Sequence, residues 1–240
     1  MQVRQQTILE LLVKEYIRTA EPVGSQILVQ NYKLDLSPAT VRNEMSELEE
    51  QGYLYQPHTS AGRAPTDKGY RFFVNKVVYE IPKQNRQERV EINVKKRMGG
   101  FGKNDSHQLV KEISKIMSDF SRNVGICGFL EEEDFYASGL SNLFKEPEFL
   151  KNEETPDFLE VFDSLDKEIE KMFSRIENEV QVFIGKENII DAFDDMSLVV
   201  SRCNAKHSRK GVVGILGPRR MNYARNIALV DAVRDLIHEF

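Results

Sequence analysis

Apolar residues near the start of the chain recur at the period of an amphipathic helix. Residues 4–19 follow this pattern and predict one helix, which stops before a proline. Its inward face is predicted to consist of Ile8, Leu11, Leu12 and Tyr16.

A second, shorter helix is predicted over residues 25–32, after a Val-Gly turn. Ser25 suits its N-cap, because a serine hydroxyl accepts a hydrogen bond from a free amide of the first turn. We expect its inward side chains to be Ile27, Leu28 and Tyr32.

The clearest helix signal of the chain begins at Ser37, a good N-cap, followed by Pro38 at the first helical position and closed by Gly52. Apolar residues spaced four and three apart indicate one buried face in this helix. That face is predicted to consist of Val41, Met45 and Leu48.

A short strand at 53–56, a polar turn at 58–63 and a capped helix at 70–79 are predicted next. Three helices followed by a small hairpin and a further helix are typical of a winged helix-turn-helix. The sequence therefore predicts a winged-helix domain over residues 1–79.

Residues 80–106 are basic, contain a proline and a Gly-Gly-Phe-Gly turn, and show no sustained period, so a linker is predicted there. Beyond it, helical and apolar strand-like segments alternate, which predicts a second domain over 107–240 of the α/β class. The expected helices are 107–123, 157–178 and 223–240, and the expected strands are 124–130, 180–184, 197–203 and 211–216.

Net charge is −5, which by itself argues weakly against a nucleic-acid partner, because phosphate neutralisation needs lysine and arginine. Its distribution changes the picture. Residues 1–80 carry nine Lys/Arg against ten Asp/Glu, whereas residues 81–111 carry eight against three. DNA binding would therefore depend on where individual cations lie.

Cys127 and Cys203 each lie inside an apolar run, which favours reduced core thiols and a cytoplasmic protein. No apolar run approaches the roughly 20 residues that span a bilayer. The four histidines, His58, His107, His207 and His238, show no metal-ligand spacing, and no catalytic motif is present, so neither an enzyme nor a cofactor or metal is expected.

The helix that begins at Ser37 has the chemistry of a DNA recognition helix, which reads base edges with residues near its N-terminal end. Arginine can bridge guanine O6 and N7, and asparagine can bridge adenine N6 and N7, which suits Arg42 and Asn43 to base readout. Ser37 and Thr40 lie at the positive end of the helix dipole, where phosphates are favoured.

The polar turn His58-Thr59-Ser60-Ala61-Gly62-Arg63 is the candidate wing, with Arg63 as the cation at its tip. Taken alone, this hexapeptide favours an ordinary hairpin loop over a wing. The complete set of candidate DNA contacts is Ser25, Ser37, Thr40, Arg42, Asn43, His58, Thr59, Ser60, Arg63 and Arg71.

The run EPVGSQ at 21–26 and the long run at 36–74, which includes LSPATVRNEMSELEEQGYLYQPHTSAGR, resemble the HrcA repressor family. So do YASGLSNLFKEPEF at 136–149, VQVFIGKENI at 180–189 and GILGPRRMNYARNIALVDAV at 214–233. The resemblance implies a winged helix, then a GAF-like domain interrupted by a dimerising insertion. It also implies a heat-shock repressor that binds the CIRCE inverted repeat, is kept active by the chaperonin GroEL and is released on heating.

The chain departs from this pattern between VGICGFL and YASGLSNLF, where it has five residues in place of a long family segment. The GAF-like domain is therefore expected to be abbreviated. A homodimer would then form through residues 107–240, by the apolar faces of the helices at 107–123 and 223–240.

Two other classes of function stay open at this point. GAF-like domains often sense small molecules, and a well-formed apolar pocket with convergent polar groups would indicate that role. Alternatively, the chain is a protein-interaction factor that has lost CIRCE binding, which a salt-dependent operator assay would reveal.

Overall fold

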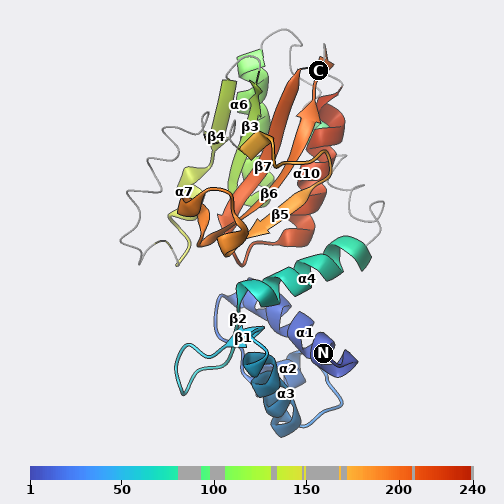
Figure 1. Cartoon of the computed structure of the whole chain (residues 1–240), viewed down its shortest axis with the longest axis vertical. Coiled ribbons are helices and arrows are strands. Elements are labelled where there is room, and N and C mark those ends of the chain that lie inside the picture. Colours follow the sequence, from blue (N-terminus) through green and yellow to red (C-terminus); the bar gives the residue numbers. More distant parts are fainter. Residues whose placement is uncertain are drawn as a thin grey trace. The chain divides into compact units, whose positions relative to one another are not determined.

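The computed structural model describes residues 1–80, 93–97, 106–130, 134–147, 149, 168, 172–206 and 209–238. The chain divides into two compact units, Met1–Glu80 and Ile81–Phe240 (Figure 1). Most of the predicted linker at 80–106 and of the predicted helix at 157–178 lies outside the described residues.

The first unit contains four helices and a two-stranded antiparallel hairpin, in the order of a winged helix. The predicted helices are all present, and the N-terminal fold expected from the sequence is confirmed. The elements are α1 (Val3–Thr19), α2 (Ser25–Tyr32), α3 (Pro38–Glu50), β1 (Leu54–Tyr55), β2 (Ala64–Pro65) and α4 (Asp67–Glu80).

The core of this unit forms where α1, α2 and α3 meet. Ile8 and Leu12 are buried as predicted, whereas Leu11 and Tyr16 are only half-buried. The inward stripe of α1 is instead completed by Leu9 and Val13.

Two expectations for α2 were wrong. Gly24 is the N-cap, in an extended conformation, and Ser25 is the first helical residue, buried at 6% exposure. Ile27 is 43% exposed, while Leu28 is fully buried. Neighbouring residues are about 100° apart around a helix, so a short helix that packs on one side buries only one of the two.

The second unit is built on a five-stranded sheet in the order β4-β3-β7-β6-β5, antiparallel throughout. The predicted mixture of helices and strands is confirmed. The elements are α6 (Ser106–Ser121), β3 (Val124–Phe129), β4 (Asp134–Ser138), α7 (Leu140–Leu143), β5 (Gln181–Ile184), η2 (Gly185–Glu187), η3 (Asp191–Phe193), β6 (Met196–Asn204), β7 (Lys210–Pro218) and α10 (Tyr223–Ile237).

Strand β4 lies in an acidic stretch where the sequence predicted none. It is the edge strand beside β3, and its described residues are half-buried rather than fully buried. A continuous apolar run is the signal of a strand covered on both faces, as in β3, and an edge strand gives a weaker one.

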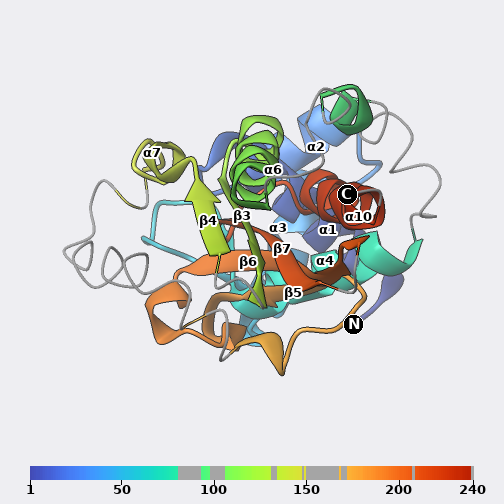
Figure 2. The ribbon, with the colours of Figure 1, turned by 90° about the horizontal axis from the view of Figure 1, so that it is seen from above.

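Helices α6 and α10 lie side by side on one face of the sheet (Figure 2). Their apolar residues are buried against the strands. The Tyr223 hydroxyl of α10 also lies 2.8 Å from the Ser197 hydroxyl of β6. The expectation that these faces stay free for a partner was therefore wrong. The sheet needs them, because its strands β3, β6 and β7 carry apolar residues on both faces.

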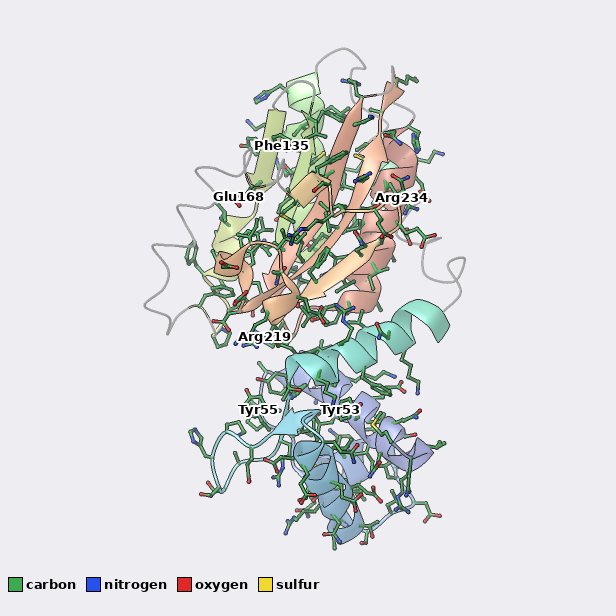
Figure 3. The ribbon with its side chains drawn as sticks, viewed as in Figure 1. Tyr53, Tyr55, Phe135, Glu168, Arg219 and Arg234 are labelled. Atoms are coloured by element: carbon green, nitrogen blue, oxygen red, sulfur yellow. The ribbon has the colours of Figure 1, made fainter. Side chains whose placement is uncertain are left out.

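The opposite face of the sheet carries a second apolar cluster, formed with α7 and with segments around residues 172–176 and 189–193. Arg219, just beyond β7, donates to Asp195 at 2.8 Å and joins the end of β7 to the turn before β6 (Figure 3). Cys127 and Cys203 are both buried, as expected for core thiols, and they do not form a disulfide with each other. Burial raises the pKa of Cys203 to about 12.

Residues 93–97 are helical, and within them Val94 is fully buried. Arg97, one of the cations counted in the basic stretch, pairs with Asp119 of α6 at 2.5 Å. No described helix is long and apolar enough to cross a membrane.

Within the first unit, Glu15 is a buried carboxylate that ties α1 to α2. It is 3% exposed, and it accepts hydrogen bonds from Arg18 at 2.5 Å, from Asn31 at 3.0 Å and from the hydroxyl of Tyr32 at 3.1 Å. The hydrogen bond from Arg18 is the main reason that the pKa of Glu15 is lowered.

We predict that Glu15→Gln lowers the free energy of unfolding by about 1–3 kcal/mol at neutral pH, since it replaces a buried carboxylate that accepts hydrogen bonds from three side chains by an amide whose NH2 group cannot accept them. A lowered pKa in the folded state contributes stability above the unfolded-state pKa, about 4.3 for glutamate, and that stability is lost as pH falls through the folded-state pKa. The difference between wild type and variant should therefore shrink in urea titrations below about pH 4. Glu10→Gln, which affects the more exposed pairs with Lys14 and Lys76, is the control, with an expected loss under about 1 kcal/mol. Equal effects of the two changes would contradict the role of Glu15.

Candidate nucleic-acid interface

The packing of α3 decides which of its side chains face outward. Val41 and Leu48 are fully buried and Met45 is 3% exposed, as the spacing predicted. This leaves Arg42 and Asn43 on the opposite side, where both are exposed. The two candidate base-reading residues are therefore adjacent on the free face of the second turn.

The N-terminus of α3 is closed by its own hydroxyls. The Ser37 Oγ accepts from the Thr40 amide at 3.0 Å and lies 2.8 Å from the Thr40 Oγ1, which confirms the predicted cap. No acidic residue lies in the first turn. The positive end of the helix dipole thus faces solvent beside Arg42, without a neighbouring carboxylate in that turn.

The acidic residues of α3 lie further along the helix, and three of them have partners from other segments. Glu44 pairs with Arg4, Glu47 accepts from the Gln5 amide at 2.7 Å, and Glu49 pairs with Arg63. The two arginines partly offset the negative charge that would otherwise repel a polyanion. They also hold the helix to the rest of the unit.

The loop between β1 and β2 has the shape of a compact wing. The Gln56 side-chain amide donates to the carbonyl of Thr59 at 3.1 Å and to that of Ala61 at 2.8 Å, which closes the loop across its base. His58, Thr59 and Ser60 are exposed at its outer end. Tyr53 and Tyr55 lie where the wing begins, and Tyr55 is 45% exposed (Figure 3).

Arg63 does not lie at the tip of this wing, and the expectation that it is the tip cation was wrong. Its side chain is 14% exposed, and its Nε lies 2.8 Å from the Glu49 Oε2. Its backbone pairs with Val23. The chain has already returned to the sheet by this residue, so its side chain points to α3 rather than outward.

Two other candidate DNA contacts are also less exposed than expected. Ser25 is buried at the start of α2. Arg71 is half-buried on α4. The structure thus brings together Ser37, Thr40, Arg42 and Asn43 on α3 and presents His58, Thr59 and Ser60 on the wing.

Three residues that matter to this surface were missed by sequence reasoning: Glu49, Gln56 and Val23. They are a glutamate on a polar helix, a glutamine in a loop and a valine in a turn, and none has distinctive chemistry alone. The available signal was that EPVGSQ and HTSAGR both belong to the family resemblance. Their partnership depends on a contact between residues forty positions apart, Val23 and Arg63.

The second unit contains a small cavity. A cavity of about 20 Å³ lies in the apolar cluster, which is little more than the room for one water molecule. Its described lining is apolar, including Ile126, Phe193 and Val212. This cavity therefore lacks the convergent polar groups that a ligand site needs.

Comparison with known proteins gives a consistent result. The family described as "HrcA protein C terminal domain" matches residues 75–227. The "Heat-inducible transcription repressor HrcA" of Natranaerobius thermophilus is 31% identical over 320 aligned positions, which cover 95% of this chain and 93% of the relative. The protein of the same name from Carboxydothermus hydrogenoformans is 27% identical, with 98% and 97% covered.

The alignment with the first relative also measures what this chain lacks. It extends over 320 positions against 240 residues in the chain, so at least 80 positions face gaps here. In fold, the chain is similar to a crystal structure titled as that of a hypothetical protein, with a TM-score of 0.82 at 20% identity, covering 100% of this chain and 98% of that one.

We predict that Ser37→Ala lowers the free energy of unfolding of the first unit by about 1 kcal/mol, because the Thr40 amide loses its acceptor. Chemical denaturation of the full chain measures the change. Ser37→Asp, which keeps an acceptor at the cap, should stay within about 0.5 kcal/mol of wild type. A loss as large for aspartate as for alanine would show that the cap is not the cause.

Proposed function

The chain belongs to the HrcA family, of which it is a shortened member, and on this basis we propose that it is a negative regulator of heat-shock transcription. It would bind an inverted-repeat operator of the CIRCE type as a dimer and release it on heating. The observation that carries the proposal is the exposure of Arg42 and Asn43 on a helix whose neighbouring carboxylates are partnered.

In this proposal the first turns of α3 enter the major groove. Arg42 and Asn43 read base edges, where each well-made bidentate contact discriminates by about 1–3 kcal/mol. Ser37 and Thr40 contact the phosphate backbone beside the helix N-terminus. The wing residues His58, Thr59 and Ser60 contact the adjacent phosphate backbone of the DNA. Arg71 of α4 adds a positive charge that attracts the same phosphates.

The proposal requires a dimer, because an inverted repeat has two half-sites related by a two-fold axis. We place the contact within residues 107–240. The apolar faces of α6 and α10 are already used on the sheet, so the contact would use other surfaces of the second unit. GroEL remains a proposed partner that keeps the repressor active. Since the operator lies on chromosomal DNA, we also propose that the protein acts in the cytoplasm.

We expect no catalysis from this protein, since its relatives carry the name of repressors. The ligand-sensing alternative gains no support from the small apolar cavity. The interaction-factor alternative predicts normal folding without operator binding, which the next experiment distinguishes.

We predict that Arg42→Ala and Asn43→Ala each weaken binding to a CIRCE duplex by about 1–3 kcal/mol, with little change on a scrambled duplex. The reason is that base-edge contacts exist only on the correct sequence. Fluorescence anisotropy on the two duplexes at one stated salt concentration measures both affinities. Lys14→Ala, which removes an exposed cation of α1 paired with Glu10, is the matched control and should leave both unchanged.

Equal losses on the two duplexes would remove Arg42 and Asn43 from base readout. Absence of any preference of the wild-type protein for CIRCE would contradict the proposed function and favour the interaction factor.

We also predict a homodimer of the full chain that operator DNA strengthens through mass action. Sedimentation of the protein at micromolar concentration, alone and with the duplex, measures the mass of each species. A single protein chain both free and on the duplex would refute dimeric recognition.

A further inference from the structure

The base of the wing is attached to α3 by one side chain, that of Arg63. Its Nε lies 2.8 Å from the Glu49 Oε2, and its terminal Nη2 lies 3.4 Å from the Ser46 Oγ. Both partners lie on α3, with Ser46 about one turn and Glu49 about two turns beyond Arg42. The guanidinium therefore connects the end of the wing loop to the helix proposed to read DNA.

The backbone of Arg63 makes a second attachment, to the turn between α1 and α2. The Val23 amide donates to the Arg63 carbonyl at 2.8 Å, and the Arg63 amide donates to the Val23 carbonyl at 2.9 Å. A Cβ at Gly62 would lie 2.4 Å from the Val23 carbonyl carbon, so only glycine allows this approach. Arg63 is thus held by its main chain on one side and by its side chain on the other.

The positive charge of Arg63 is neutralised within the protein by Glu49. Its side chain is 14% exposed and that of Glu49 is 33% exposed, so the ion pair is partly shielded from water. The contact is an ion pair and not an aligned hydrogen bond at Nε, and the Coulomb attraction between two charges is stronger where water is partly excluded. An arginine engaged in this way adds little net attraction to a phosphate, because Glu49 cancels its charge.

We propose that Arg63 is a positioning residue, which with Glu49 sets the orientation of the wing relative to α3. Gln56 completes the arrangement by closing the loop itself. Pre-organisation of this kind raises affinity by removing the ordering cost from the binding step. The inference rests on the proposed function, because it assigns to the wing a role in DNA binding.

The first test is a double-mutant cycle on CIRCE and scrambled duplexes, with Arg63→Ala, Glu49→Ala and the two together. Each single change should weaken operator binding roughly tenfold, and the double variant should be no weaker than either. The slope of log affinity against log salt should stay that of wild type. Circular dichroism at the assay temperature confirms that each variant is folded.

Arg63→Lys separates positioning from phosphate contact. Lysine keeps the charge but loses the planar fork that reaches Glu49 and Ser46, so this variant should lose as much affinity as Arg63→Ala. A phosphate contact would instead be largely retained in the lysine variant. It would also make Arg63→Ala reduce the salt slope by about one, and Glu49→Ala strengthen binding. Any of these three results would overturn the proposal.

Hydrogen exchange tests the positioning role of Arg63 in the protein alone, without operator DNA. The Val23 and Arg63 amides bond each other's carbonyls, so their hydrogen exchange reports whether the wing base is closed. Glu49→Gln, a mild change at a partly exposed site, should speed exchange at both amides roughly tenfold. Unchanged exchange would refute the positioning role. If the wild type fails to bind CIRCE while exchange responds, the proposed function fails and the structural coupling stands.

Discussion

The burial of one face of α3 is the constraint on which the N-terminal unit depends. Val41, Met45 and Leu48 are buried where α3 packs on α1 and α2. A rotation of α3 that buried Arg42 and Asn43 would expose these three apolar side chains. The polar contacts around α3 stabilise the same orientation of this helix. They hold its carboxylates against other segments, so that the free face presents an arginine, an asparagine and an uncrowded helix N-terminus.

In the second unit, polar side chains from the segments that resemble the family also hold turns and neighbouring elements together. The Asn188 side-chain amide lies within 3.0 Å of the carbonyls of Gly185, Phe193 and Met196, and so holds the turns between β5 and β6. Ser114 of α6 lies 3.0 Å from Ser138 of β4, hydroxyl to hydroxyl. Such hydrogen bonds from buried polar side chains favour a single loop conformation, which accounts for these contacts by structure alone.

The topology of the sheet explains how the chain tolerates its shortened sequence. Strands β3 and β4 are antiparallel neighbours, with Phe129 opposite Asp134, so a few residues are enough to connect them. A short connection at this point is compatible with the observed register of β3 with both β4 and β7. The sheet can therefore be complete in a chain at least 80 positions shorter than the alignment with its relative.

Periodicity and capping residues determined the helices of the first unit, because both act within a few neighbouring positions: the spacing of Val41, Met45 and Leu48 and the cap at Ser37 were readable directly. The same local signals placed the apolar strands β3, β6 and β7, but not the half-buried edge strand β4. Only the tertiary structure decided the role of Arg63, since its pairing with Val23 and Glu49 joins segments that are distant in the chain. Likewise, it decided that Ser25 is buried and Ile27 exposed, because local hydrophobicity does not record which side of a short helix meets its neighbours.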